Sequence, residues 1–129
     1  LEPVPNRDLL SRTMSHDVGL ALEEPHCPSR DLSATNKIFE YMRAGLAVVA
    51  TTTRGQSEIF ELTPGIGSQI APAQPSALAN AMQYMVDNPQ FLFDCRVQSE
   101  KAARQCWDWD LHRDELVRQV CTLFANDKV

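Results

Sequence analysis

The amino-acid sequence predicts an α/β fold in which helices flank an open parallel sheet. Short apolar runs alternate along the chain with segments whose apolar residues recur at helical spacing. The runs are apolar at consecutive positions, as in strands that are covered on both faces. Because buried strands that alternate with helices pair in parallel through right-handed crossovers, these two observations favour a parallel sheet.

Three of the runs are predicted strands. Asp17–Leu22 and Leu46–Ala50 are almost wholly apolar, and the second is rich in β-branched residues. The third, Ile66–Ala71, is weaker because Gly67 and Gln69 interrupt it. Since an open sheet of this kind usually has about five or six strands, we expect the others in sequence upstream of the first residue.

Helical spacing and capping residues predict the helices that alternate with these strands. Gly45 stands where a left-handed residue ends a helix. The polar stretch 23–32 is predicted to be a loop, because Pro25 and Pro28 disfavour regular pairing. The predicted helices cover residues 6–16, 34–44, 56–62, 76–87, 89–106 and 110–124. The predicted N-caps are Asn6, Ser33, Asn88 and Asp110.

The last three helices supply much of the remaining predicted core. In the helix over residues 76–87 the side chains expected to point inward are Leu78, Ala81, Met82, Met85 and Val86. Trp107 and Trp109 are predicted to form a hinge that packs the final helix back across the sheet.

Composition and charge argue against several classes of protein. The 129 residues carry 12 basic and 17 acidic side chains, and the net charge of −5 argues against general affinity for nucleic acid or anionic lipid. No apolar run approaches the ~20 residues of a membrane helix. The four cysteines lack the C-x-x-C spacing, so we expect reduced, mostly buried thiols of a cytoplasmic protein.

Polar side chains suited to an anionic ligand gather around the helix that follows the first predicted strand. Open α/β sheets bind ligands at the carboxyl ends of their strands, and a helix N-terminus there favours a diphosphate. The short polar side chains are Ser33, Thr35 and Asn36. Lys37 adds a positive charge. Glu40, one turn after Asn36, is suited to accept two hydroxyl hydrogens, such as those of a ribose.

A second interpretation of this segment requires no ligand. A serine cap followed by lysine and glutamate is common on solvated helix faces, and Glu40 can then pair with Arg43 or Arg30 across the surface. The three histidines have no ligand spacing, so no metal site is predicted.

Residues 36–51, together with Gly55, Glu58 and Ile59, resemble the carboxy-terminal domain of retaining glycosyltransferases with the GT-B fold, specifically the family 4 group (glycosyl transferases group 1). The GT-B fold has two facing Rossmann-like domains. The resemblance extends over nearly all of residues 16–124. It implies that residues 1–129 are a partial carboxy-terminal domain with a Rossmann-like sheet, without the amino-terminal acceptor domain and the first strands of this domain.

The resemblance also implies a site for a nucleoside diphosphate sugar, such as a UDP- or GDP-sugar. Glu40 is expected to hold the ribose hydroxyls, and the amides around residues 33–36 to contact the diphosphate and the sugar. The family often has a second glutamate that contacts the donor sugar, and here that position is Leu32. Glu23 and Glu24 lie too far upstream to occupy that position without a rearrangement of the loop.

We therefore expect the donor-binding part of a retaining hexosyltransferase, with no catalytic residue in residues 1–129 and no turnover by this chain alone. Its partners are expected to be the nucleotide-sugar donor, the amino-terminal domain of the same protein, and a glycan, lipid or small-molecule acceptor. No cofactor and no obligatory metal is expected, because amides, the helix dipole and basic side chains take up the charge. The expected location is cytoplasmic, either free or peripheral to a membrane.

Two alternatives remain open from the sequence. One is a non-catalytic Rossmann-like binding or scaffold module derived from the same family, with Leu32 marking a lost sugar contact. The other is a related two-domain nucleotide-sugar enzyme such as an epimerase.

Overall fold

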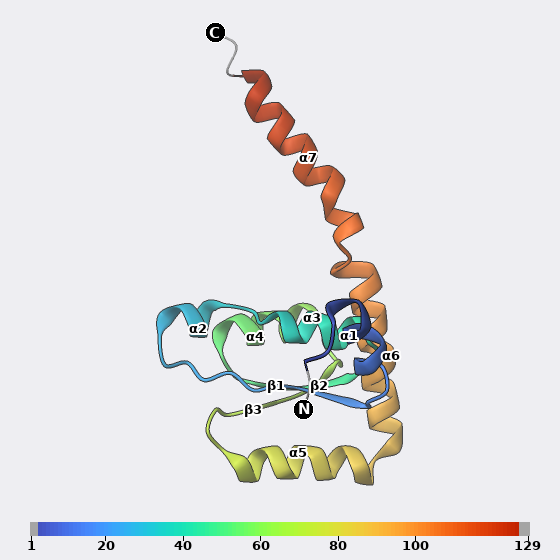
Figure 1. The fold of residues 1–129 in the computed structure, drawn as a ribbon. Helices are drawn as coiled ribbons and strands as arrows, with labels where there is room; N and C mark the ends of the chain where they lie inside the picture. The colour runs from blue at the N-terminus through green and yellow to red at the C-terminus, as the bar shows by residue number, and fades with distance from the viewer. Residues whose placement is uncertain (1–2, 127–129) are drawn as a thin grey trace.

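The computed structural model describes residues 3–126, which form three strands and seven helices (Figure 1). In chain order the elements are α1 (Asn6–Thr13), β1 (Val18–Ala21), α2 (Pro28–Leu32), α3 (Asn36–Arg43), β2 (Ala47–Thr51), α4 (Arg54–Leu62), β3 (Gly67–Ile70), α5 (Pro75–Asp87), α6 (Pro89–Cys106) and α7 (Trp109–Asn126).

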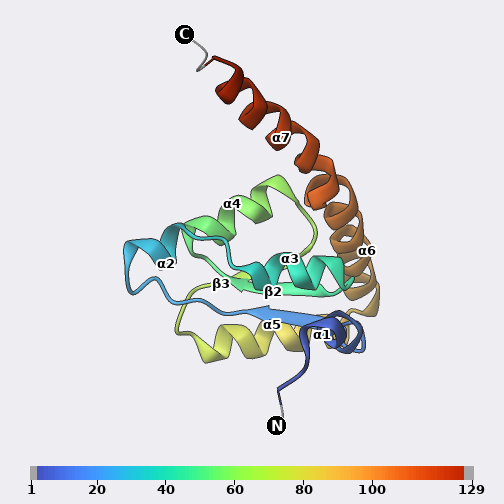
Figure 2. The same cartoon turned by 45° about the horizontal axis from the view of Figure 1, so that its top comes forward.

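The three strands form one parallel sheet in the order β1-β2-β3. Val18 of β1 pairs with Ala47 of β2, and Val48 of β2 pairs with Gly67 of β3. Helices α3 and α4 lie on one face of the sheet, α5 lies on the other, and α6 runs past one end of the strands (Figure 1, Figure 2). The predicted α/β class, a parallel Rossmann-like sheet with flanking helices, is confirmed.

The central strand β2 is buried along its whole length. Successive side chains of β2 point to opposite faces of the sheet. Val48 and Ala50 pack in a core with α3 and α4, and Ala47 and Val49 pack in a second core with α5 and α6. The first core also contains Ala21, Ile38, Met42, Ile59, Ile66 and Ala102. A strand without polar side chains facing water is stable only between two layers of helices, so β2 fixes the layered architecture.

Gly45 ends α3 as the sequence predicts. Its φ of +69° lies in the left-handed region, where glycine has no Cβ to clash. The Gly45 N–H donates to the Met42 carbonyl, and the Leu46 N–H donates to the Tyr41 carbonyl, both at 3.0 Å. This pair of bonds is the Schellman motif, and it turns the chain directly from α3 into β2.

The prediction that the first strand is covered on both faces is wrong for β1. Its buried residues are Gly19 and Ala21, whereas Leu20 is 37% exposed. Strand β1 is an edge strand of this sheet. On the face to which Leu20 points, the helices pack against the other strands, α5 against β3 and α6 against β2 and β3. An apolar run shows that a segment can be buried, but it does not show which strand stands at an edge.

The predicted start of the helix after β1 is also wrong. Helix α3 begins at Asn36, two residues later than predicted, because the Thr35 side chain caps it by accepting the Lys37 N–H at 3.4 Å. Ser33, the predicted cap, instead ends α2, which lies inside the stretch predicted as a loop. Pro28 is the first residue of α2, where the missing N–H removes no helical hydrogen bond.

Two other helices begin at different residues from those predicted. Asn6 is the first residue of α1 and not its cap; Pro5 precedes it, and no side chain caps the helix. Helix α4 begins at Arg54, earlier than predicted, because Thr53 Oγ1 accepts the Gln56 N–H at 3.4 Å.

The predicted caps of the last two helices act differently. Asn88 is the N-cap residue of α6, as predicted, but its side chain makes no capping hydrogen bond to that helix and instead donates to the Tyr84 carbonyl of α5 at 2.8 Å. Asp108 caps α7 in place of Asp110, since Asp108 Oδ1 accepts the Asp110 N–H at 3.0 Å.

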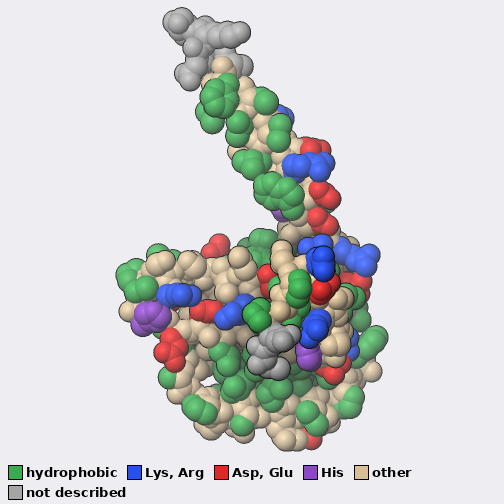
Figure 3. Space-filling model, viewed as in Figure 1, with side chains coloured by type: hydrophobic (Ala, Val, Ile, Leu, Met, Phe, Trp, Pro, Cys, Tyr) green, Lys and Arg blue, Asp and Glu red, His purple; other side chains and the backbone are tan. Residues whose placement is uncertain are grey.

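Helix α7 does not pack back across the sheet, contrary to the sequence prediction. It follows directly after the end of α6 and projects away from the sheet (Figure 1, Figure 2). Trp107 packs edge-on against Phe39 with ring centroids 5.2 Å apart, but Trp109 is exposed. Apolar side chains are visible along α7 in Figure 3, and helical spacing predicted them without showing what they cover. No helix within residues 3–126 is both long and apolar enough to cross a membrane.

Two predictions about burial are corrected as well. The cysteines are free, as expected, but Cys95 alone is buried, and Cys27, Cys106 and Cys121 are exposed. Val86 of α5 was expected to point inward and is 68% exposed, because α5 buries only a narrow stripe against the sheet.

Truncation of two valines tests this layering. We expect Val49→Ala, on the fully buried β2, to lower the free energy of unfolding by about 1–3 kcal/mol, because it opens a cavity between two packed layers. Val86→Ala, on the exposed side of α5, is the matched control and should change it by less than about 0.5 kcal/mol. Urea unfolding of both variants measures the difference; equal losses would contradict the layering.

Candidate functional site

The candidate site lies where β1 and β2 end. The chain leaves β1 into residues 22–24 and leaves β2 into residues 52–53, and the strands are parallel, so both ends stand at one edge of the sheet. Helix α3 begins after residue 35 and α4 after residue 53, so their first turns adjoin the same edge. We call residues 22–24, 30–37 and 51–56 the carboxyl edge.

Glu23 is fixed at this edge through its backbone. Its N–H donates to Thr51 Oγ1 at 2.9 Å, and the Thr51 hydroxyl donates to the Glu23 carbonyl at 2.6 Å. Thr51 is the last residue of β2, and the buried Gln56 side chain of α4 donates to its carbonyl and approaches its hydroxyl, both at 2.9 Å. The loop after β1 is therefore tied to the end of β2.

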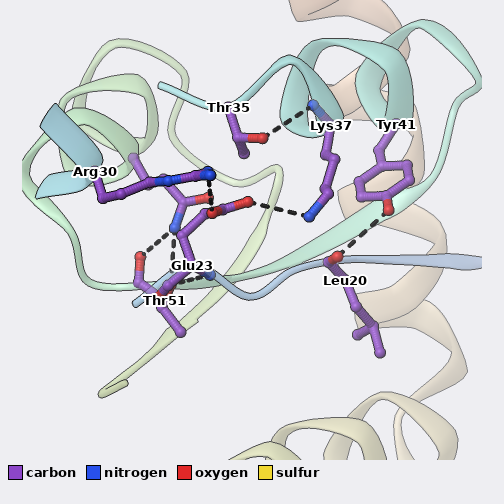
Figure 4. A network of polar contacts seen from close by, with 8 residues as sticks. Leu20, Glu23, Arg30, Thr35, Lys37, Tyr41 and Thr51 are labelled. Carbon is purple, nitrogen blue, oxygen red and sulfur yellow. Dashed lines mark hydrogen bonds and ion pairs between the residues drawn. The ribbon is translucent and has the colours of Figure 1, made fainter. Parts of the chain in front are cut away.

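Two cations approach the Glu23 carboxylate from different helices (Figure 4). Lys37 Nζ of α3 lies 3.1 Å from Oε1, and Arg30 Nη1 of α2 lies 3.3 Å from Oε2. The hydrogen bond from Lys37 holds the pKa of Glu23 below its usual range, the charges of Lys37 and Arg30 add to this, and partial burial opposes it. Glu23 is thus the anionic centre of the carboxyl edge.

A second ion pair stands beside the first and connects α2 with α4. Arg54 Nε lies 3.4 Å from Asp31 Oδ2, and the Arg54 backbone N–H donates to Asp31 Oδ1 at 3.1 Å. Asp31 therefore holds the first turn of α4 with both oxygens, as acidic side chains commonly do at a helix N-terminus. The carboxyl edge contains three cations, Arg30, Lys37 and Arg54.

Gly55 allows α4 to approach the chain that leads into α3. A Cβ at this position would lie 2.6 Å from the Ala34 nitrogen and 2.6 Å from the Ser33 carbonyl oxygen. Because these atoms belong to the backbone, they cannot move aside as a flexible side chain does. The absence of a side chain at Gly55 thus brings the starts of α3 and α4 together.

The structure brings some of the predicted site residues to the carboxyl edge. Thr35 caps α3, and Lys37 extends to Glu23. Ser33 is exposed where α2 ends, and Asn36 is exposed in the first turn of α3. Their contacts show where they lie, and their ligand roles stay predictions.

Glu40 lies apart from the Glu23 ion pairs. It lines a hollow of about 1090 Å³ between α1, α3, α6 and the start of α7, together with Phe39 and Trp107, whereas Lys37 does not line it. Within residues 3–126, Glu40 forms no ion pair with Arg43 or with any other side chain. Arg30 is paired with Glu23, so the surface pairing considered for Glu40 is not found.

Sequence reasoning missed the centre of this network. It considers Glu23 only as a substitute for the glutamate expected at position 32, and it does not single out Thr51 as a site residue. The available signal was that each follows an apolar run directly, at the carboxyl end of a predicted strand. Leu32 itself is exposed at the end of α2. The described residues contain no group of three or more His, Cys, Asp or Glu side chains that is arranged to hold a metal ion.

Replacement of Glu23 tests the ion pairs through stability. Because folding lowers the pKa of Glu23, its contribution is present above the unfolded-state pKa, about 4.3, and is lost as the pH falls. We expect Glu23→Gln to lower the free energy of unfolding by less than about 1 kcal/mol at pH 7, since both cations are more than half exposed. The loss should shrink as the pH falls below the unfolded-state pKa, and it should vanish once the pH is below the lowered pKa of folded Glu23. Urea unfolding over a series of pH values measures it, and a loss that does not depend on pH would contradict the ion pairing.

Gly55→Ala tests the close approach of the two helix starts. In an exposed helix this substitution usually stabilises by about 1 kcal/mol, because alanine has the higher helix propensity. Here we expect a destabilisation of about 1–3 kcal/mol, because the new methyl group meets backbone atoms. Thermal unfolding checks the sign; a variant at least as stable as the parent chain would show that the approach is not tight.

Comparisons with known proteins bear on the segment that contains this network. Residues 26–88 match the model of the family described as Glycosyl transferases group 1, over slightly less than half of the chain. The matched segment includes α2, α3, β2, α4, β3 and α5. Comparison with curated proteins and with solved structures found no match. The chain therefore contains a glycosyltransferase-like α/β domain, similar over residues 26–88 to the group 1 glycosyl transferases.

Proposed function

We propose that this chain is the donor-binding part of a retaining hexosyltransferase, which binds the diphosphate of a sugar donor at the carboxyl edge and its ribose beside Glu40, one turn further along α3. One observation carries the proposal. The ends of β1 and β2 and the first turns of α3 and α4 meet at this edge, and the cations Arg30, Lys37 and Arg54 stand there, within the segment similar to group 1 glycosyl transferases.

The diphosphate fits the start of α3. The helix dipole and the amides that the Thr35 cap does not take up give the N-terminus of α3 a partial positive charge, roughly half a unit, which favours an anion. Ser33, Thr35 and Asn36 supply short polar side chains in this stretch. Lys37 supplies a full charge on a flexible stem, so it can follow a phosphate without a fixed geometry.

The ribose fits beside Glu40. Asn36 and Glu40 are one turn apart on α3, which is about 6 Å along the helix axis, a length on the scale of the separation between a diphosphate and its ribose. An ionised carboxylate only accepts hydrogen bonds, so Glu40 suits the two ribose hydroxyls and not a phosphate. The hollow that Glu40 lines has the aromatic rings of Phe39 and Trp107 in its wall.

Several further features belong to the same proposal. Amides, helix dipoles and basic side chains take up the charge of the diphosphate, so the reaction needs neither an obligatory metal nor another cofactor. Residues 1–129 are a partial carboxy-terminal domain, and an amino-terminal domain outside them holds the acceptor, a glycan, lipid or small molecule. The chain alone then shows no turnover, and the whole protein acts in the cytoplasm or at a membrane surface.

The exposed apolar side of α7 favours a second candidate, a non-catalytic scaffold module. Leu116, Val120 and Leu123 are exposed on this helix, and a helix with unpartnered apolar residues is suited to bind another protein. Nucleotide binding separates the two candidates, because a scaffold needs none.

Calorimetric titration of the chain with UDP and with GDP tests the proposal. We expect at least one of them to bind with micromolar to millimolar affinity. Glu40→Ala should weaken this binding by about 1–3 kcal/mol, because two hydrogen bonds to a charged group are lost.

Glu61→Ala is the matched control, since Glu61 is also an exposed glutamate but lies near the end of α4. It should leave the affinity unchanged. Failure of both nucleotides to bind, or an equal loss in the two variants, would overturn the donor site and favour the scaffold module.

A further inference from the structure

The three groups in the Glu23 ion pairs differ in how firmly they are held. The Glu23 backbone is hydrogen-bonded to the Thr51 hydroxyl through both its N–H and its carbonyl. The side chain of the buried Gln56 donates in turn to the Thr51 carbonyl. The Glu23 side chain is only 14% exposed. The Glu23 backbone is therefore fixed at the carboxyl edge, and the low exposure of the side chain limits the positions that the carboxylate can reach.

The two cations are far less constrained. The Lys37 side chain is 51% exposed and that of Arg30 is 58% exposed. Both are long side chains with several rotatable bonds, and among residues 3–126 neither donates to, or pairs with, any side chain other than Glu23. Each can therefore turn from Glu23 to another anion by rotation of its own stem, without movement of the backbone.

An anion that reaches this edge meets two cations that already share one carboxylate as a partner. Arg30 and Lys37 approach different oxygens of the same carboxylate, so a single group occupies both. An incoming anion competes with the Glu23 carboxylate for the N–H groups of both cations, and it also stands close to the negative charge of Glu23. The fixed carboxylate thus opposes anion binding in two ways.

We propose that Glu23 is a built-in counter-anion of the donor site, which holds Lys37 and Arg30 in position while the site is empty and competes with the diphosphate for them. This inference rests on the proposed function, because it assigns a positioning residue and an autoinhibitory contact to the same site. It predicts that removal of the Glu23 charge strengthens anion binding, although the same change weakens the fold. A purely structural role predicts no such gain.

Calorimetric titration with inorganic pyrophosphate tests the inference on the 129-residue chain. Glu23→Gln retains the shape of the side chain and should bind pyrophosphate about 3- to 10-fold more tightly than the parent chain, because two ion pairs no longer have to be broken. Glu24→Gln is the matched control: it removes the same charge one residue away, from an exposed side chain that forms no ion pair among the described residues. It should change the affinity by less than 2-fold, because solvent and salt screen an exposed charge that forms no ion pair.

A combined variant separates competition from a general effect of charge. In the Lys37→Gln, Arg30→Gln background, the gain from Glu23→Gln should fall to that of the Glu24→Gln control, since no cation is left to release. Equal affinities of Glu23→Gln and Glu24→Gln, or a gain that persists without the two cations, would overturn the counter-anion.

The outcomes distinguish this inference from the proposed function. If UDP or GDP binds but Glu23→Gln brings no specific gain for pyrophosphate, the donor site stands and the counter-anion is wrong. If pyrophosphate binding shows the gain while neither nucleotide binds, Glu23 does compete with anions for the two cations, but the donor site is wrong. If neither pyrophosphate nor a nucleotide binds to any variant, both are wrong.

Discussion

The burial of β2 is the constraint on which the rest of the structure depends. A strand with five buried residues requires a layer of helices on each face and a hydrogen-bonded strand on each side. Parallel pairing with β1 and β3 then aligns the carboxyl ends of the strands. Because α3 connects β1 to β2 and α4 connects β2 to β3, both helices begin at this edge of the sheet. The polar network at the edge is thus a consequence of how the apolar core is closed.

For ligand binding, the difference in how tightly Glu23 and its two cations are constrained matters more than the strength of the ion pairs. Exposed pairs contribute little to stability, typically below ~1 kcal/mol. Their geometry nevertheless decides what an incoming ligand meets. Thr51 fixes the backbone of Glu23, whereas Lys37 and Arg30 hold their positions only through that carboxylate. The position of the negative charge is therefore constrained by the fold, whereas the two positive charges can adopt other positions.

Local sequence patterns predicted the helices and strands of this fold. They did not predict which strand lies at the edge or which side chains meet there, because those features depend on contacts between residues distant in sequence. The apolar runs and Gly45 were sufficient for the strands and for the turn from α3 into β2, because those signals are local. The exposure of Leu20 was missed, since sheet order is a tertiary property. Glu23 was missed for the same reason: its partners lie 7, 14 and 28 residues away along the chain.

The central claim is that ligands bind where β1 and β2 end. Backbone amide spectra of the ¹⁵N-labelled chain, recorded during titration with UDP and with GDP, test this claim directly because they report the position of binding. The account predicts that the largest shifts occur at residues 23–24, 33–40 and 53–56. Shifts concentrated in α5 or α7, or no shifts at saturating nucleotide, would contradict it.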